Sequence, residues 1–321
     1  MDLLLWSTIF IVALGLLIKS SDYFIDASQE IGVYFKLSPV VIGTLILALG
    51  TSLPELVTSV LSVFKNESEI VLGNVIGSNI ANTCLIFGII LLMKPDRDSL
   101  KFPSFKVDNW TVLAVTAFLI YAISDGVISS IESGIFIACF LLYVIYTIRS
   151  SNPEEMLDVD IKDTDQFPGK YLVFLILSGI GIYFGADYTI QAIVEISKIL
   201  GIGKDIIAVT VVALGTSLPE LVVSLMAAKK GSMEMAVGNV LGSSIFNILC
   251  VAGISSLLGP VIVSKNIHFP GVPFLALVTA FSFLIILINR PSKFFGALFL
   301  VFYFLFNFEI VFRVLADYLE K

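Results

Sequence analysis

Charged side chains are scarce in this chain, which excludes an ordinary water-soluble domain. Only 14% of the 321 residues are Asp, Glu, Lys or Arg, whereas 57% are hydrophobic. The mean hydropathy is +1.00, and apolar runs of about 20 residues, the length that crosses a bilayer, recur from end to end. Because irregular backbone cannot face lipid, the composition predicts an all-α membrane protein.

Side chains for soft-metal and acid–base chemistry are nearly absent. His268 is the single histidine, and Cys84, Cys139 and Cys250 lie far apart in apolar runs, without metal-ligand spacing or a disulfide framework. Zinc chemistry and histidine catalysis therefore have almost no raw material. The sequence holds no catalytic motif and no basic patch interleaved with aromatics. It predicts no enzyme, no cofactor, no nucleic-acid partner and no obligate protein partner.

Loop markers such as Lys65-Asn66-Glu67 and Asn289-Arg290-Pro291 separate the apolar runs. Each run between markers is long enough for one membrane crossing, and together they predict ten transmembrane helices. The predicted spans are residues 3–28, 38–64, 69–93, 109–124, 128–148, 171–198, 205–228, 234–258, 271–289 and 293–317.

An acidic hydrophilic segment, residues 149–170, divides these spans into five and five. It predicts a first five-helix repeat over residues 1–148 and a second over residues 171–321. A solvated linker is the favoured interpretation of the segment, and a cation-collecting vestibule is the alternative.

The nine residues from Ala48 to Leu56, ALGTSLPEL, occur again from Ala213 to Leu221. Adding 165 to a residue number in the first copy gives its partner in the second. The same offset relates Gly73-Asn74 to Gly238-Asn239, Gly77-Ser78 to Gly242-Ser243, Asn82 to Asn247, and Asp22 to Asp187. The chain therefore contains an internal duplication.

Five is an odd number of crossings, so the second repeat enters the membrane from the side opposite to the first. The sequence therefore predicts two inverted five-helix repeats. With the N-terminus outside, inner loops hold twice as many basic residues as outer segments, which favours an outer N-terminus and a cytoplasmic central linker. The two sets are Lys36, Lys94, Arg97, Lys101, Lys106, Arg149, Lys162, Lys170, Lys229, Lys230, Arg290 and Lys293 inside, and Lys65, Lys198, Lys204, Lys265, Arg313 and Lys321 outside.

Glu55 and Glu220 are equivalent carboxylates inside apolar spans. Burial of a charge at mid-membrane costs at least ~2.5–3.5 kcal/mol on insertion scales, and two equivalent costs indicate a function. Pro54 removes a backbone donor and clashes with the carbonyl of Gly50, so we expect a helix break that frees carbonyls near Ala48 to Thr51. A structural kink is the alternative interpretation.

The third span adds Asn74, Ser78 and Asn82, which lie four residues apart on one helix face. Their partners do the same in the eighth span. The hydroxyls of Thr51, Ser52, Thr216 and Ser217 complete an all-oxygen set, which hard cations prefer, and a flexible cage of this kind favours calcium. The paired glycines also permit close helix packing. For Asp22 and Asp187, helix packing and a place on the ion path both stay open.

These blocks resemble the two alpha-repeats of the sodium/calcium exchanger family, within the calcium/cation antiporter superfamily. The resemblance rests on GTSLPE at 50–55 and 215–220 and on GNVIGS and GNVLGS at 73–78 and 238–243. The short linker is similar to that of compact prokaryotic members, which implies a prokaryotic cell (inner) membrane.

The resemblance also implies roles for individual residues. Glu55 and Glu220 would be shared by Ca²⁺ and Na⁺, and Asn82 and Asn247 would close the centre. The remaining ligands would be backbone carbonyls of Thr51 and Thr216 for calcium, carbonyls of Ala48 and Ala213 for sodium, and hydroxyls of Ser52, Ser217, Ser78 and Ser243 for sodium.

The predicted function is secondary antiport of Na⁺ against Ca²⁺ by alternating access, with these ions and the lipid bilayer as the only partners. One calcium neutralises both carboxylates, so the two ions compete for one site. A proton/calcium antiporter is the nearest alternative, because glutamates also carry protons. A cation channel with the glutamates as a selectivity ring is a third reading.

Overall fold

Helices account for nearly all of the part of the chain that the computed structural model describes, namely residues 2–93, 105–150, 169–200, 215, 217–262 and 270–319. The first half contains α1 (Asp2–Tyr34), α2 (Pro39–Val41), η1 (Ile42–Leu47), α3 (Ala48–Phe64), α4 (Glu69–Ile80), η2 (Ala81–Ile86), α5 (Phe87–Met93), α6 (Lys106–Ala122) and α7 (Ser130–Arg149). The second half contains α8 (Gly169–Ile199), α10 (Leu218–Lys229), α11 (Met233–Phe246), η5 (Asn247–Ala252), α12 (Gly253–Leu258), α13 (Val272–Leu287) and α14 (Lys293–Leu319).

Helix starts follow local sequence signals. The Ser38 hydroxyl accepts the Val41 amide at 3.4 Å, and Pro39 occupies the first turn of α2, where its missing N–H costs nothing. At α7, Ser129 and Glu132 form a reciprocal capping box.

Three composite helices are the most buried of the long apolar helices in the described part of the chain. In their most apolar windows, 61% of residues are buried for Pro39–Phe64, 78% for Glu69–Met93 and 89% for Met233–Leu258. The corresponding fraction for α1, α7, α8 and α14 is 17–28%. A helix that is apolar on all sides belongs in a core or a membrane, so these last helices present their apolar faces to lipid.

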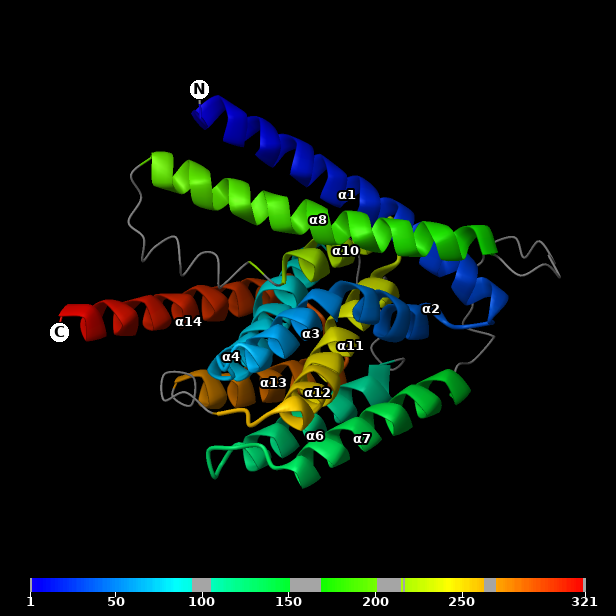
Figure 1. Cartoon of the computed structure of the whole chain (residues 1–321). Helices are drawn as coiled ribbons and strands as arrows, with labels where there is room; N and C mark the ends of the chain where they lie inside the picture. Colours follow the sequence, from blue (N-terminus) through cyan, green and yellow to red (C-terminus); the bar gives the residue numbers. More distant parts are fainter. Residues whose placement is uncertain are drawn as a thin grey trace.

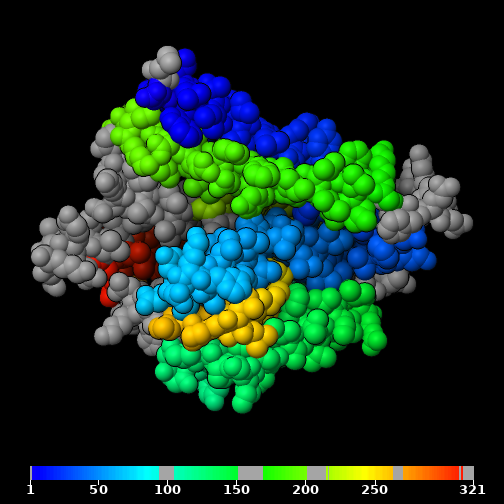
Figure 2. Space-filling model, in the orientation of Figure 1, coloured from blue at the N-terminus to red at the C-terminus, as the bar shows by residue number. Residues whose placement is uncertain are grey.

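The outer helices cover this centre in layers. In Figure 1, α1 and α8 lie side by side across the top, and the two pack together along their length. On the opposite side, α7 packs against α12 and η5, while α6 packs against α13. The space-filling view in Figure 2 shows the central helices between these two layers.

Glycines allow α11 to approach η1 at backbone distance. A Cβ on Gly238 would lie 2.9 Å from the Val40 carbonyl oxygen, and a Cβ on Gly242 would collide with the backbone of Thr44. Gly43 reciprocates, because a Cβ there would lie 2.5 Å from the Met235 carbonyl oxygen. Small residues that bring helices together are typical of membrane packing.

The predicted all-α membrane fold is confirmed. Each of the ten predicted spans coincides with described helix, although the seventh is described only from Leu218 and the first extends to Tyr34. Seven of the described helices are long and apolar enough to cross a membrane. The proposed linker lies largely at 151–168, outside the described residues, and the repeat boundaries stay a prediction.

The predicted helix break at Pro54 is wrong. The α3 helix continues through Pro54 from Ala48 to Phe64. The irregularity lies about two turns earlier, in the π-helical segment η1 (Ile42–Leu47), and π-helical turns often occur at functional sites. Pro54 still removes the donor that the Gly50 carbonyl would otherwise receive.

The glycine contact between α11 and η1 makes a stability prediction. Gly242→Ala should lower the free energy of unfolding by about 1–3 kcal/mol, since the new methyl group must displace backbone rather than a flexible side chain. Gly134→Ala in α7 is the matched control, because nothing lies within 4 Å of a Cβ at that position. Thermal unfolding of both variants in detergent would reveal an error if Gly242→Ala unfolded no earlier than the control.

Candidate functional site

The two copies of the repeated motif meet in the buried centre. The Ser52 hydroxyl in α3 donates to Oε1 of Glu220 in α10 at 2.8 Å. The Thr51 hydroxyl lies 3.3 Å from Oδ1 of Asn239 and 3.5 Å from the hydroxyl of Ser243, both on α11. Side chains from residues nearly 200 positions apart therefore share one polar cluster.

Hydrogen bonds around the two glutamates repeat with the offset of 165. Asn74 donates from Nδ2 to the Glu55 carbonyl oxygen at 3.1 Å and to the Ser59 hydroxyl at 3.0 Å. Asn239 donates from Nδ2 to the Glu220 carbonyl oxygen at 3.5 Å and to the Ser224 hydroxyl at 2.9 Å. The same asparagine and serine thus support the backbone of each glutamate.

Several buried polar atoms of this cluster have no hydrogen-bond partner among the described residues. They are both carboxylate oxygens of Glu55, Oε2 of Glu220, and both amide atoms of Asn82 and Asn247. All four side chains are 0–1% exposed. Buried polar groups left unpaired cost free energy, so a concentration of them at one place indicates a bound species.

The glutamates lack a cationic partner within the described residues, where every ion pair involves other side chains. Ser52, one turn before Glu55 in α3, donates to Glu220, so both carboxylates belong to the same cluster. Two buried like charges repel strongly at low dielectric. A cation between them would remove this repulsion.

π-Helical segments hold the two central asparagines. Asn82 lies in η2 and Asn247 begins η5, at equivalent places in the two repeats. A π-helical turn contains one more residue than an α-helical turn and rotates the following side chains. The unpaired amides of Asn82 and Asn247 belong to these irregular turns.

The donor set consists of oxygens. Among the described residues there is no group of three His, Cys, Asp or Glu side chains suited to a soft or transition metal. Two carboxylates with hydroxyl, amide and carbonyl oxygens match the preferences of Ca²⁺ and Na⁺. The arrangement can therefore hold hard cations.

A cavity of about 510 Å³ leads toward this cluster. Pro54 and Pro219, the neighbours of the two glutamates, line it together with Asn74 and Ser78. Its other lining residues are Thr58, Ile70, Gly73, Gly77, Tyr183, Ala186, Asp187, Ile190 and Gly215. Among them, Thr58 and Ile70 mark the side where α3 ends and α4 begins.

Most of the predicted site residues are buried around this cluster. Ala213 and Thr216 lie outside the described residues, so their predicted roles are carried forward unchanged. The described members, each at most 5% exposed, are Ala48, Thr51, Ser52, Glu55, Ser78, Asn82, Ser217, Glu220, Ser243 and Asn247.

Sequence reasoning missed two serines. Ser59 and Ser224 accept hydrogen bonds from Asn74 and Asn239 and are fully buried. Both are serine at the offset of 165, so a comparison extended beyond the nine-residue block would have found them. They fix the asparagines rather than face an ion.

A membrane protein in which two helical repeats bury a shared polar site has the architecture of a secondary transporter. The family model for sodium/calcium exchanger proteins matches residues 5–149 and 170–312. The chain therefore belongs to the sodium/calcium exchanger family, whose members are antiporters and not enzymes.

Individual relatives agree with this assignment. The sodium/calcium exchanger MaX1 of Methanosarcina acetivorans is 30% identical over 296 residues, covering 80% of this chain and 84% of the relative. The putative antiporter CaxA of Alkalimonas amylolytica is 30% identical over 264 residues, covering 80% and 82%. A solved structure of the sodium-calcium exchanger NCX_Mj superimposes with a TM-score of 0.80 at 30% identity, covering 94% of this chain and 97% of that one.

The unpaired carboxylates make a prediction about stability. Glu55→Gln should raise the unfolding temperature measured without calcium or sodium, because it removes like-charge repulsion and breaks no ion pair. It should also abolish the stabilisation by calcium, which for one site amounts to about 2.7 kcal/mol at 100 times Kd.

The control is Glu69→Gln, an exposed carboxylate in the first turn of α4. Thermal unfolding in detergent with a calcium titration measures both effects. If calcium stabilised Glu55→Gln as much as the unmodified protein, Glu55 would not be a ligand.

Proposed function

We propose that the protein exchanges Na⁺ for Ca²⁺ through one shared site that contains Glu55 and Glu220. The observation that carries the proposal is the pair of buried carboxylates, which have no cationic partner among the described residues and belong to a cluster with unpaired amide atoms. Family membership supports calcium/cation antiport as the activity. That sodium, rather than protons, drives calcium transport is the part of the proposal that goes beyond family membership.

The proposed ligand roles are those that the family resemblance implies for these positions. Glu55 and Glu220 supply the charge, while Ser52 and Ser217, Ser78 and Ser243 supply hydroxyls for sodium. Backbone carbonyls of Thr51 and Thr216 serve calcium, those of Ala48 and Ala213 serve sodium, and Asn82 and Asn247 close the centre.

Charge couples the two fluxes. One calcium ion neutralises both carboxylates, whereas sodium ions must occupy several places to do so, and the loads exclude each other. The ion-free site keeps its repulsion, so movement of the empty site through a closed state is unfavourable. The protein therefore exchanges one ion for the other and does not let either ion cross alone.

Asymmetry between the repeats supports alternating access. On one side, Gly238 and Gly242 pack against Val40 and Thr44 at backbone distance. Residues 205 and 209, which correspond to Val40 and Thr44, lie outside the described residues, and the cavity opens at the turn between α3 and α4, where Thr58 and Ile70 line it. The conformation is therefore open toward the α3–α4 turn and closed toward the α10–α11 turn.

The proposed orientation puts the N-terminus outside and the central linker in the cytoplasm of a prokaryotic cell, in its inner membrane. In that orientation the α3–α4 turn is external, and the open cavity receives ions from outside. Na⁺ and Ca²⁺ are substrates, and no cofactor is required for the exchange.

Ion flux in proteoliposomes tests the proposal. An outward or inward sodium gradient at fixed pH should drive radioactive calcium in the opposite direction, and Glu55→Ala or Glu220→Ala should reduce this flux at least a hundredfold. If only a pH gradient drove calcium, the protein would be a proton/calcium antiporter. Rates far above carrier turnover would instead indicate a channel.

Asn247→Asp tests the central position of that residue. The substitution adds a titratable carboxylate beside Glu55 and Glu220, so protons should compete with the ions more strongly as the pH falls. We expect calcium flux to fall more steeply with acidification than in the unmodified protein. An identical pH profile would move Asn247 away from the ion path.

A further inference from the structure

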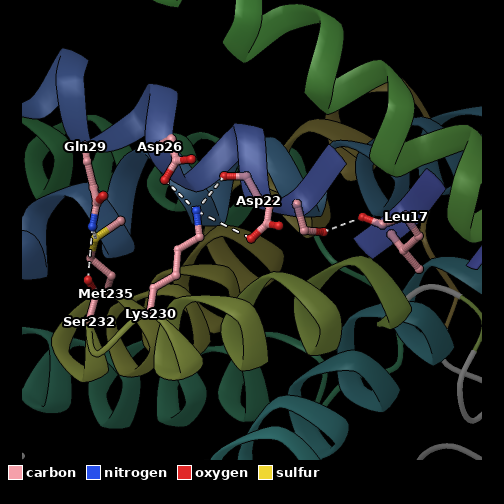
Figure 3. A network of polar contacts seen from close by, with 8 residues as sticks. Leu17, Asp22, Asp26, Gln29, Lys230, Ser232 and Met235 are labelled. Atoms are coloured by element: carbon pink, nitrogen blue, oxygen red, sulfur yellow. Dashed lines mark hydrogen bonds and ion pairs between the residues drawn. The ribbon is translucent and has the colours of Figure 1, made fainter. Parts of the chain in front are cut away.

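Lys230 ties α1 to the turn between α10 and α11. Its ammonium nitrogen lies 2.5 Å from Oδ1 of Asp26 and 3.4 Å from Oδ1 of Asp22, and it donates to the Asp22 carbonyl oxygen at 3.1 Å. Figure 3 shows the lysine reaching up from the turn to two successive turns of α1. The contact joins residues about 200 positions apart.

A second polar contact lies one turn further along α1. Gln29 donates from Nε2 to the Ser232 hydroxyl at 3.0 Å and lies 3.5 Å from the sulfur of Met235. Asp22, Asp26 and Gln29 follow one another at helical spacing, so one face of α1 makes both contacts. We call this set, with Lys230, Ser232 and Met235, the α1 latch (Figure 3).

The offset of 165 relates the charged part of the α1 latch to a second set of residues. Lys230 corresponds to Lys65 in the α3–α4 turn, and Asp22 corresponds to Asp187 in α8. In this conformation Asp187 accepts a hydrogen bond from Gln191 at 2.8 Å and lines the open cavity. Among the described residues no carboxylate lies within 4.0 Å of Lys65.

In an inverted repeat, the opposite conformation is reached when the two repeats exchange their arrangements. A contact between the repeats is then replaced by its partner at the offset of 165. The Lys230–Asp22 ion pair on the closed side would give way to a Lys65–Asp187 ion pair on the other side.

We propose that Lys230 and Lys65 are alternating positioning residues of the transport cycle, each of which holds the α1–α8 pair closed over one side of the site. Lys230 with Asp22 and Asp26 closes the α10–α11 side, and Lys65 with Asp187 closes the α3–α4 side. This proposal rests on the alternating access of the proposed function. It also gives Asp22 and Asp187 a common role.

The two latches are unequal in strength. Asp26 corresponds to Gln191, so the Lys65 latch has one carboxylate where the Lys230 latch has two. Gln29 corresponds to Val194, which cannot donate a hydrogen bond. The conformation closed by Lys230, which is the one described, is therefore favoured when no ion is bound.

Solvent limits the size of the effect. The Lys230, Asp22 and Asp26 side chains are 26%, 27% and 55% exposed. Ion pairs with this degree of exposure contribute modestly, so loss of the α1 latch should change the ratio of the two conformations by about two- to tenfold. Such a bias alters rates without abolishing transport.

Cysteine accessibility measures the ratio directly. Cys84, Cys139 and Cys250 are replaced by alanine, and Ile190→Cys places a thiol in the cavity wall on α8. Labelling of purified protein with a polar maleimide, without sodium or calcium, reports the fraction with an open cavity. Because the open conformation is the favoured one, Lys230→Gln should slow labelling by a smaller factor than the two- to tenfold change in the ratio, and Lys65→Gln should not slow it.

Lys229→Gln is the matched control, since Lys229 neighbours Lys230 but has no carboxylate within 4.0 Å among the described residues. If Lys230→Gln does not fold, Asp26→Asn breaks the same ion pair from α1 and should slow labelling likewise. Exchange of the charges, Lys230→Asp with Asp26→Lys, should restore the rate.

Equal labelling of the Lys230→Gln and Lys229→Gln proteins would overturn the proposal, as would faster labelling of Lys230→Gln. The measurement needs no ion gradient. A failure of sodium-driven flux would therefore leave the accessibility result standing, and a failure here would leave sodium coupling intact.

Discussion

The constraint on which the rest of the structure depends is a pair of buried carboxylates that form no ion pair with any residue the structure describes. Glu55 and Glu220 are each 1% exposed, and both carboxylate oxygens of Glu55 and Oε2 of Glu220 have no hydrogen-bond partner among the described residues. A protein of modest stability carries such a cost only where a ligand offsets it. Ser52 donates to Oε1 of Glu220, while Asn74 and Asn239 donate to the backbone carbonyl oxygens of Glu55 and Glu220, so these hydrogen bonds fix the backbone that carries both carboxylates.

The helices around the two carboxylates pack differently on the two sides of the site. On one side, glycines on α11 bring its backbone into contact with the backbone of η1. On the other side, a cavity of about 510 Å³ reaches the prolines next to both glutamates. Because the two repeats have nearly the same site residues, this difference reflects arrangement more than composition. In an inverted repeat the two halves can exchange their arrangements. The α1 latch joins the two halves, so this exchange would break it.

Much of this architecture was predictable from the sequence, for identifiable reasons. Apolar runs define membrane helices through length alone, and the offset of 165 pairs Glu55 with Glu220 without any structural information. The π-helical segments were not predictable, because they arise from packing between helices and not from a local motif. The prediction of a helix break at Pro54 failed for the same reason, since packing against neighbouring helices keeps α3 helical at the proline. The contacts of Lys230 join distant turns and leave no periodic signal in either segment.

The central claim is that sodium and calcium use the same carboxylates. Equilibrium binding of radioactive calcium to purified protein, at fixed pH and with increasing sodium, tests it most directly. The account predicts that the apparent Kd for calcium rises without limit as sodium increases, while the number of bound calcium ions extrapolated to saturation stays constant. An apparent Kd that levels off at high sodium would mean that both ions bind together at separate sites, and would contradict the account.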